Sequence, residues 1–149
     1  MATVDNLIAK EYDTLRQQLV GQFFEYGWEL LAFAGALGWD LQHKAEVPDK
    51  GSIVKTFSDS DRGDSLLVDL LALVSHAKKE DESPDDGVAA MQCLDDDKFN
   101  DRCKELTAYA NGGLEYVQKV HETTGMTYSE VVLNIVEDGA DPTVIRPLG

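Results

Sequence analysis

Three histidines and two cysteines are the side chains of this sequence best suited to hold a metal ion. His43, His76 and His121 lie in three separate predicted elements, and none has an Asp, Cys or second His at the spacing of metal ligands. Cys93 and Cys103 stand ten residues apart, with no second pair. The pattern predicts reduced, buried thiols in a cytosolic protein and no metal site.

Clustered aspartates are the other candidates for a cation site. The run DSDRGD (59–64) resembles a calcium loop, but Leu70 stands where a bidentate acid is needed and Gly63 falls one position early. A second cluster, Asp95–Asp97, precedes a predicted helix, whose positive N-terminal end favours carboxylates. Helix capping is the better interpretation, and a metal-dependent nuclease subunit is an alternative hypothesis. That alternative requires a histidine to converge with acids drawn from Asp59, Asp61, Asp69, Asp95, Asp96 and Asp97.

Motifs of the common enzyme classes do not occur in the chain. Gly112-Gly113 lacks a following Lys-Ser/Thr and follows no predicted strand, so it is not a phosphate-binding loop. There is no nucleophile elbow and no Ser-His-Asp or Cys-His signature. Glu25, Glu29 and Asp69 lie in apolar runs, but pairing with a base, or a helix position that faces water, explains them more simply than acid–base catalysis. We predict no enzyme activity and no cofactor.

The balance of charge favours protein partners over nucleic acid. Among 149 residues, 28 acids oppose 13 bases, which gives a net charge of −15. Such a surface repels phosphate, so direct binding of nucleic acid is not expected. Three explanations stay open: solubility, as in a salt-adapted organism; docking onto a protein with a basic surface; and mimicry of DNA that inhibits a nucleic-acid-binding protein.

Helical periodicity dominates the chain and predicts one all-α domain over residues 1–149, a bundle of about five helices. A short irregular or β-like excursion is expected near 42–61, with a strand or an extended loop at 52–57. The acidic linker is expected at 80–97 and a coil tail at 140–149. The helices are expected at 5–19, 23–41, 66–79, 97–124 and 127–138.

Neither a membrane span nor a secretion signal is expected. The apolar window Phe23–Trp39 carries Glu25 and Glu29, so it predicts a buried helix. The opening MATVDNLIAKEYD has charges where a signal peptide needs an apolar run, and a cytoplasmic protein is expected.

Two adjacent glycines interrupt the longest predicted helix. Each glycine inside a helix costs about 1 kcal/mol relative to alanine. The apolar stripe nevertheless keeps its phase through Asn111, Gly112 and Gly113, which favours one continuous helix with Gly113 on the buried stripe. In the competing interpretation, Gly112 ends one helix and another begins at once. A continuous helix predicts that Gly112→Ala is neutral or slightly stabilising.

Small residues at three places are expected to let backbones pack closely. Gly27 and Gly35 lie on the two apolar stripes of the helix expected at 23–41, and Gly113 lies on that of 97–124. At 127–138, Thr127 and Glu130 have the spacing of a capping box, although β-branched residues keep a strand possible there.

Two segments, in this order, resemble a known family. FFEYGWELLAFAGALGWDLQHKAEVPDKGSIVKTF (23–57) is an aromatic-rich helix leading into a basic, proline-containing loop, and LTAYANGGLEYVQKV (106–120) centres on Tyr-Ala-Asn-Gly-Gly-Leu. They resemble the small accessory proteins of Dnd-type DNA phosphorothioation systems, the Dnd system-associated protein 4 family. The chain departs from the pattern at His43-Lys44, where an arginine-rich turn is expected, and in the acidic linker.

The resemblance implies an intracellular antiphage defence component without established catalytic residues, working among larger nucleases or ATPases. We therefore expect a non-catalytic adaptor that binds a protein with a basic surface. The residues expected to bind that partner are Tyr109, Asn111 and Gly112, together with the acids Asp85, Asp86, Asp95 and Asp96.

Overall fold

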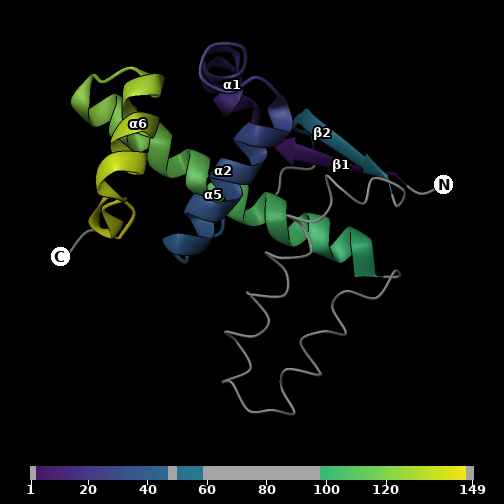
Figure 1. Ribbon diagram of the computed structural model, residues 1–149. Coiled ribbons are helices and arrows are strands. Elements are labelled where there is room, and N and C mark those ends of the chain that lie inside the picture. The colour runs from purple at the N-terminus through teal and green to yellow at the C-terminus, as the bar shows by residue number, and fades with distance from the viewer. Residues whose placement is uncertain (1–2, 47–49, 59–97, 147–149) are drawn as a thin grey trace.

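A computed structural model describes residues 3–46, 50–58 and 98–146 (Figure 1). Within these ranges the chain is mostly helical and carries one two-stranded antiparallel sheet. The predicted helix at 66–79 and the acidic linker at 80–97 lie outside the described residues. In chain order the elements are β1 (Thr3–Ile8), the 3-10 helix η1 (Lys10–Tyr12), α1 (Asp13–Leu19), α2 (Gly27–Asp40), β2 (Ser52–Ser58), α5 (Phe99–Thr124), α6 (Tyr128–Asp138) and the 3-10 helix η4 (Pro142–Val144).

The mostly helical class is confirmed, and the small sheet corrects the helix expected at 5–19. The helix expected at 5–19 is present only from Asp13, because Thr3–Ile8 forms β1 and pairs with β2, from Thr3 opposite Ser58 to Ile8 opposite Ser52. The strand buries Asn6 and Ile8 and leaves Asp5 exposed. This alternation suits a strand, and its partner is more than 40 residues away, out of reach of local periodicity. A β-like element at 52–57 is confirmed as β2, whereas a bundle of about five helices is not.

Helix α2 begins four residues later than predicted. Gly21 has a positive φ of 98°, a conformation that suits glycine, and its N–H donates to the carbonyl of Phe24 at 2.6 Å. The chain therefore turns before Tyr26, whose backbone N–H donates to the Glu29 carboxylate at 2.9 Å. Glu29 stabilises the first turn of α2, which accounts for one acid of the apolar run.

The last two long helices agree with the prediction. Helix α5 runs without a break from Phe99 to Thr124 and ends at Gly125, whose φ is 75°. Helix α6 begins at Tyr128, where the Thr127 hydroxyl accepts from the N–H of Glu130 at 3.1 Å, and it ends at Gly139. The alternative of a strand at this position is wrong.

Helix α5 lies at the centre of the described fold, and α2, α6 and β1 pack against it (Figure 1). Helix α2 crosses α5 near its middle, α6 lies beside its C-terminal part, and β1 packs on it from the side of the sheet. Helix α1 packs against both α2 and α6. The buried side chains form one core that all these elements share: Ile8, Leu15, Leu19, Leu30, Leu31, Ala34, Leu106, Leu114, Val117, Val131 and Val132.

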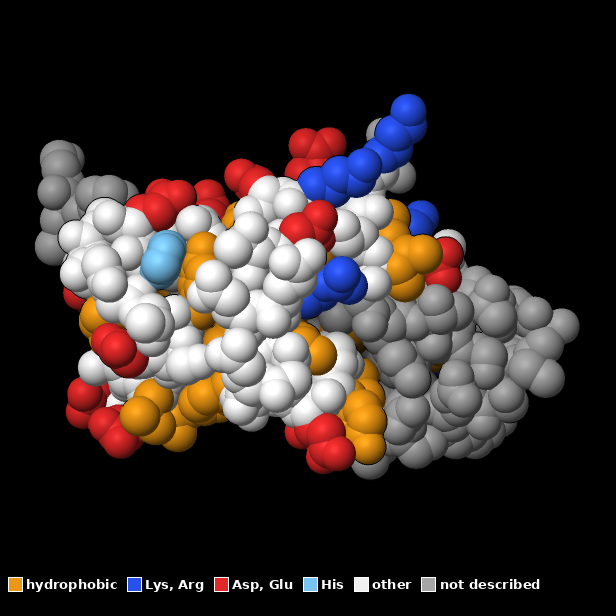
Figure 2. All heavy atoms as spheres, turned by 90° about the horizontal axis from the view of Figure 1, so that it is seen from above, with side chains coloured by type: hydrophobic (Ala, Val, Ile, Leu, Met, Phe, Trp, Pro, Cys, Tyr) orange, Lys and Arg blue, Asp and Glu red, His pale blue; other side chains and the backbone are white. Residues whose placement is uncertain are grey.

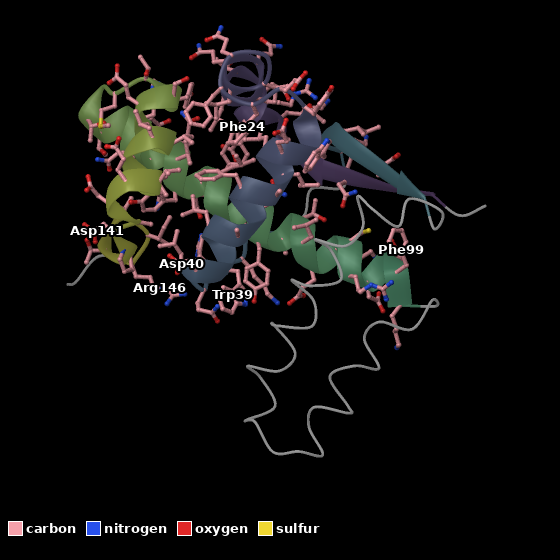
Figure 3. All side chains as sticks on the ribbon, in the orientation of Figure 1. Phe24, Trp39, Asp40, Phe99, Asp141 and Arg146 are labelled. Atoms are coloured by element: carbon pink, nitrogen blue, oxygen red, sulfur yellow. The ribbon has the colours of Figure 1, made fainter. Side chains whose placement is uncertain are left out.

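The segment after α6 is fastened to the rest of the fold. The backbone N–H of Asp141 donates to the Tyr116 hydroxyl at 2.8 Å, and the Arg146 guanidinium donates to the carbonyl of Gln42. Figure 3 shows Arg146 reaching toward the end of α2 that carries Trp39 and Asp40. The expected coil tail therefore contains η4 and contacts α5 and the end of α2.

Candidate functional site

Glycines let α5 pack closely against α2 and against the segment that follows it. A Cβ on Gly38 would lie 2.7 Å from the carbonyl carbon of Tyr109, and one on Gly113 would lie 3.0 Å from that of Ala34. One on Gly112 would lie 2.9 Å from the carbonyl carbon of His43. Real Cβ atoms essentially never approach backbone so closely, so each position requires glycine while its neighbour stays in place.

The structure thus explains why residue 112 is a glycine, which periodicity did not. It lies away from the main apolar stripe of α5, but the irregular segment that follows α2 passes over it. The N–H of His43 donates to the carbonyl of Gly38, and the N–H of Ala45 donates to that of Ala108, both within 3.0 Å. The helix is continuous, yet Gly112→Ala is not neutral, because the added methyl would meet the main chain of His43.

Asn111 holds the end of β1 against α5. Its side-chain oxygen accepts from the N–H of Ala9 at 2.9 Å, and its side-chain nitrogen donates to the carbonyl of Leu7 at 3.0 Å and to that of Thr107 at 2.8 Å. The amide therefore binds a strand carbonyl and the N–H two residues further on, much as a neighbouring strand would. Asn111 is 1% exposed.

Tyr109 is also buried, under the segment that follows α2. The Lys44 ammonium lies 4.9 Å from the centre of the Tyr109 ring and 2.8 Å from the Glu105 carboxylate. One residue earlier, the His43 imidazole pairs with the Glu115 carboxylate. These contacts fix His43-Lys44, the point where the chain departs from the arginine-rich pattern, onto the surface of α5.

That Tyr109, Asn111 and Gly112 bind a partner stays a prediction, but the structure places all three in the interior of the fold. All three are buried, and each is engaged with the end of β1 or with the segment after α2. Their types and spacing serve the helix crossing. The other residues expected to bind a partner, Asp85, Asp86, Asp95 and Asp96, lie outside the described residues.

Gly38 is the packing residue that sequence reasoning missed. Gly35 is buried within α2 as expected, but Gly27 is the first residue of the helix and is partly exposed. Gly38 lies three residues after Gly35 on the same stripe, and that spacing would have identified it.

The described residues hold no obvious metal centre. No group of three or more His, Cys, Asp or Glu side chains in the described ranges is placed to hold an ion. His121 stacks on Tyr128, with ring centres 4.0 Å apart, and bonds the carbonyl of Met126 at 2.6 Å. Cys103 is a buried free thiol. The acids that the nuclease hypothesis needs lie outside the described residues, and so do His76 and Cys93. These acids are Asp59, Asp61, Asp69 and Asp95–Asp97.

Among the described residues, one phenol and one carboxyl group have displaced pKa values. Burial, with Glu11, Glu115 and Glu122 nearby, raises the pKa of the Tyr12 phenol far above its ordinary value. Hydrogen bonds from the hydroxyl and N–H of Thr143 lower the pKa of Asp141. Burial and nearby carboxylates thus explain the displacement at Tyr12, and local hydrogen bonds explain that at Asp141.

The sequence matches the model of a known protein family. The model of DNA sulphur modification system-associated protein 4 matches residues 7–145, nearly the whole chain. The chain belongs to this family. Comparisons with curated proteins and with solved structures gave no match.

Membership of this family confirms the resemblance seen in the two sequence segments. The match includes β1 from Leu7, the helix crossing and α6 through η4, so it covers the fold and not one motif. The name of the family places its members beside a DNA sulphur-modification system, which is consistent with an accessory role. None of the helices in the described ranges has the length and apolarity that a bilayer crossing demands.

Proposed function

We propose that this chain is a non-catalytic accessory subunit of a DNA sulphur-modification system with a role in antiphage defence, and that it acts through contacts with other proteins in the cytoplasm. The family match over residues 7–145 carries this proposal. The helix crossing supports it, because the most specific hexapeptide of the chain, Tyr109–Leu114, is used for packing and not for chemistry.

The distribution of charge supports a partner with a basic surface, such as a nuclease or ATPase of the system. Residues 59–97 contain 12 of the 28 acids and only 3 of the 13 bases. Opposite fields on two proteins speed their association and are screened by salt. The same charge disfavours contact with DNA phosphates.

The test is co-purification and gene deletion in a host that carries the system. The tagged chain is purified at low and at high salt, and the proteins bound to it are identified. In parallel, the gene is removed and the phosphorothioate content of the DNA and resistance to phage are measured. We expect a protein of the system to co-purify at low salt and to be lost at high salt, and a phenotype that the wild-type gene restores.

A charge-matched pair of variants locates the contact. Asp85, Asp86, Asp95 and Asp96 are changed to Asn in one variant. The control neutralises four acids of the described fold, Glu122, Glu130, Glu137 and Asp138. We expect the first variant to lose the partner and the control to keep it.

Two results would overturn the proposal. One is cleavage of modified or unmodified DNA by the purified chain with Mg²⁺ or Mn²⁺, which would support the nuclease alternative. The other is competition between the chain and DNA for the same site of the partner, which would support DNA mimicry.

A further inference from the structure

Three large aromatic side chains lie exposed where the chain enters α2. Phe23, Tyr26 and Trp28 are 41%, 54% and 39% exposed, and they fall within six consecutive residues. We call this surface the aromatic entrance. Scattered single apolar residues are normal on a protein surface, but a contiguous group of large ones marks a binding site.

The aromatic entrance is held in place by its backbone. The carbonyl of Leu19 accepts from the N–H groups of Phe23 and Phe24, at 2.9 and 2.8 Å, and Glu29 binds the N–H of Tyr26. The turn is therefore ordered by bonds that do not involve the exposed rings.

Phe24 anchors the same turn from the inside. Its ring lies 5.1 Å from that of Phe23, edge to face, and 5.7 Å from that of Phe33, and it packs against the core. Figure 3 places Phe24 beneath α1 and beside α2. With this position taken by Phe24, the rings of Phe23, Tyr26 and Trp28 stay at the surface.

In the sequence the aromatic entrance lies between Arg16 and Lys44, and the charged side chains between these two bases are acids. Residues 17–43 contain Glu25, Glu29 and Asp40 and no Lys or Arg. Residues 120–145, which include α6 packed against α1, contain five acids and no Lys or Arg. In Figure 2 the Lys and Arg side chains of this face lie away from its α6 half, where Asp and Glu side chains and a His are seen.

We propose that the aromatic entrance is the docking surface for a protein segment that combines apolar side chains with Lys or Arg. This inference rests on the proposed function and names the surface that serves it. The apolar side chains of the partner cover Phe23, Tyr26 and Trp28, and its cations meet Glu25. An arginine is best suited, because its guanidinium also stacks on Tyr and Trp rings.

Helix α6 offers a matched control. Leu133 and Val136 are 48% and 65% exposed, lie one turn apart and share the acidic surroundings, but they are aliphatic. Interface anchors are enriched in Tyr and Trp, and Leu and Val are under-represented among them. The control therefore tests whether the rings matter or only exposed apolar area.

The experiment measures binding of the intact chain to each purified protein of the sulphur-modification system by biosensor. Three forms are compared: wild type, Phe23→Ser/Tyr26→Ser/Trp28→Ser, and Leu133→Ser/Val136→Ser. We expect the aromatic variant to lose about 100-fold or more in affinity for one of these proteins. The α6 variant should stay within about threefold of wild type.

A single charge reversal keeps the test valid if the aromatic variant does not fold, which circular dichroism shows. Glu25→Lys should weaken binding about tenfold at low salt, and by less at high salt, whereas Glu137→Lys on α6 should have little effect. Both acids are exposed, so neither change disturbs the core.

The outcomes separate the two proposals. Wild-type binding that survives both the aromatic changes and Glu25→Lys overturns the docking surface and leaves the accessory function standing. No binding of the wild type to any protein of the system overturns both. A wild-type dimer in sedimentation that the aromatic variant loses shows that the occupant is a second copy of the chain, and this also overturns the proposal.

Discussion

The two ends of helix α2 serve opposite purposes. Its C-terminal half carries the small residues Ala34, Gly35, Ala36 and Gly38, and the backbone of α5 packs closely against Ala34 and Gly38. Its N-terminal end carries Tyr26 and Trp28, with rings exposed to solvent. The hexapeptide Tyr109–Leu114 of α5 thus packs at the C-terminal end of α2, whereas the exposed rings stand at the start of the other family-like segment, 23–57. A specific motif here identifies a fold, and the functional surface has to be sought beside it.

The largest loss of stability is expected from a larger side chain at the crossing of α2 and α5. Gly113→Leu would place a side chain against the carbonyl of Ala34, where even a Cβ is too close, so α2 and α5 must separate. We expect a loss of about 3 kcal/mol or more in the free energy of unfolding. Chemical denaturation measures it. An unchanged midpoint would show that the helices do not cross as described.

The bonds of Asn111 give the next largest effect. Asn111→Ala leaves the N–H of Ala9 and the carbonyl of Leu7 without this partner in a buried place, which should cost about 2–3 kcal/mol. The control is Asn100→Ala on the exposed side of the same helix, which should change stability by less than about 0.5 kcal/mol. Equal effects in the two variants would contradict the role of Asn111.

Gly112→Ala distinguishes a packed glycine from a tolerated one. Alanine favours helix by about 1 kcal/mol, but here its methyl meets the backbone of His43. Because His43 belongs to an irregular segment that can shift, we expect a net loss of only about 1–2 kcal/mol. A thermal melt of the variant that matches or exceeds wild type would mean that the segment moves freely.

The buried phenol of Tyr12 makes the stability of the fold depend on pH. An unfolded tyrosine titrates near pH 10, whereas burial and three nearby glutamates raise the pKa of folded Tyr12 far above that. The folded chain then holds a proton that the unfolded chain loses. Stability is therefore full below pH 10 and declines above it, by up to about 1.4 kcal/mol per pH unit. Denaturation at pH 9 and pH 11 should show this decline in wild type and a smaller one in Tyr12→Phe.

The smallest effect on stability is expected at the aromatic entrance. Tyr26→Ser removes an exposed ring and places a favoured capping residue directly before α2, so the free energy of unfolding should change by less than about 0.5 kcal/mol. A large loss, measured by the same denaturation, would show that the ring supports the fold and is not held for a partner.

Local signals predicted the helices well and the sheet poorly. Thr127 and Gly125 identified the junction of α5 and α6, because a cap acts within a few residues. Thr3–Ile8 was expected to be helical, because the strand that pairs with it lies far along the chain. The start of α2 was misplaced for a similar reason, since the turn at Gly21 prevails over an apolar pattern that continues through it.

The site was harder to predict than the fold. The phase of the apolar stripe predicted a continuous helix through Gly112 and Gly113, but it could not show that a segment after α2 covers Gly112. Tyr109 and Gly112 were expected on a partner-binding surface of small residues, together with Asn111. Its partners, Ala9 and Leu7, come from a strand that periodicity did not reveal.

The hydrogen bonds of Asn111 also help to protect the chain from aggregation through its strand edges. Strand edges attract other strands, and a two-stranded sheet has two of them. At the rung where Leu7 faces Ile53, the carbonyl of Leu7 is bound by Asn111 and that of Ile53 by the Arg16 guanidinium at 3.1 Å. Helix side chains thus occupy acceptors on both strands that an incoming chain would need, so this rung resists growth into a larger intermolecular sheet.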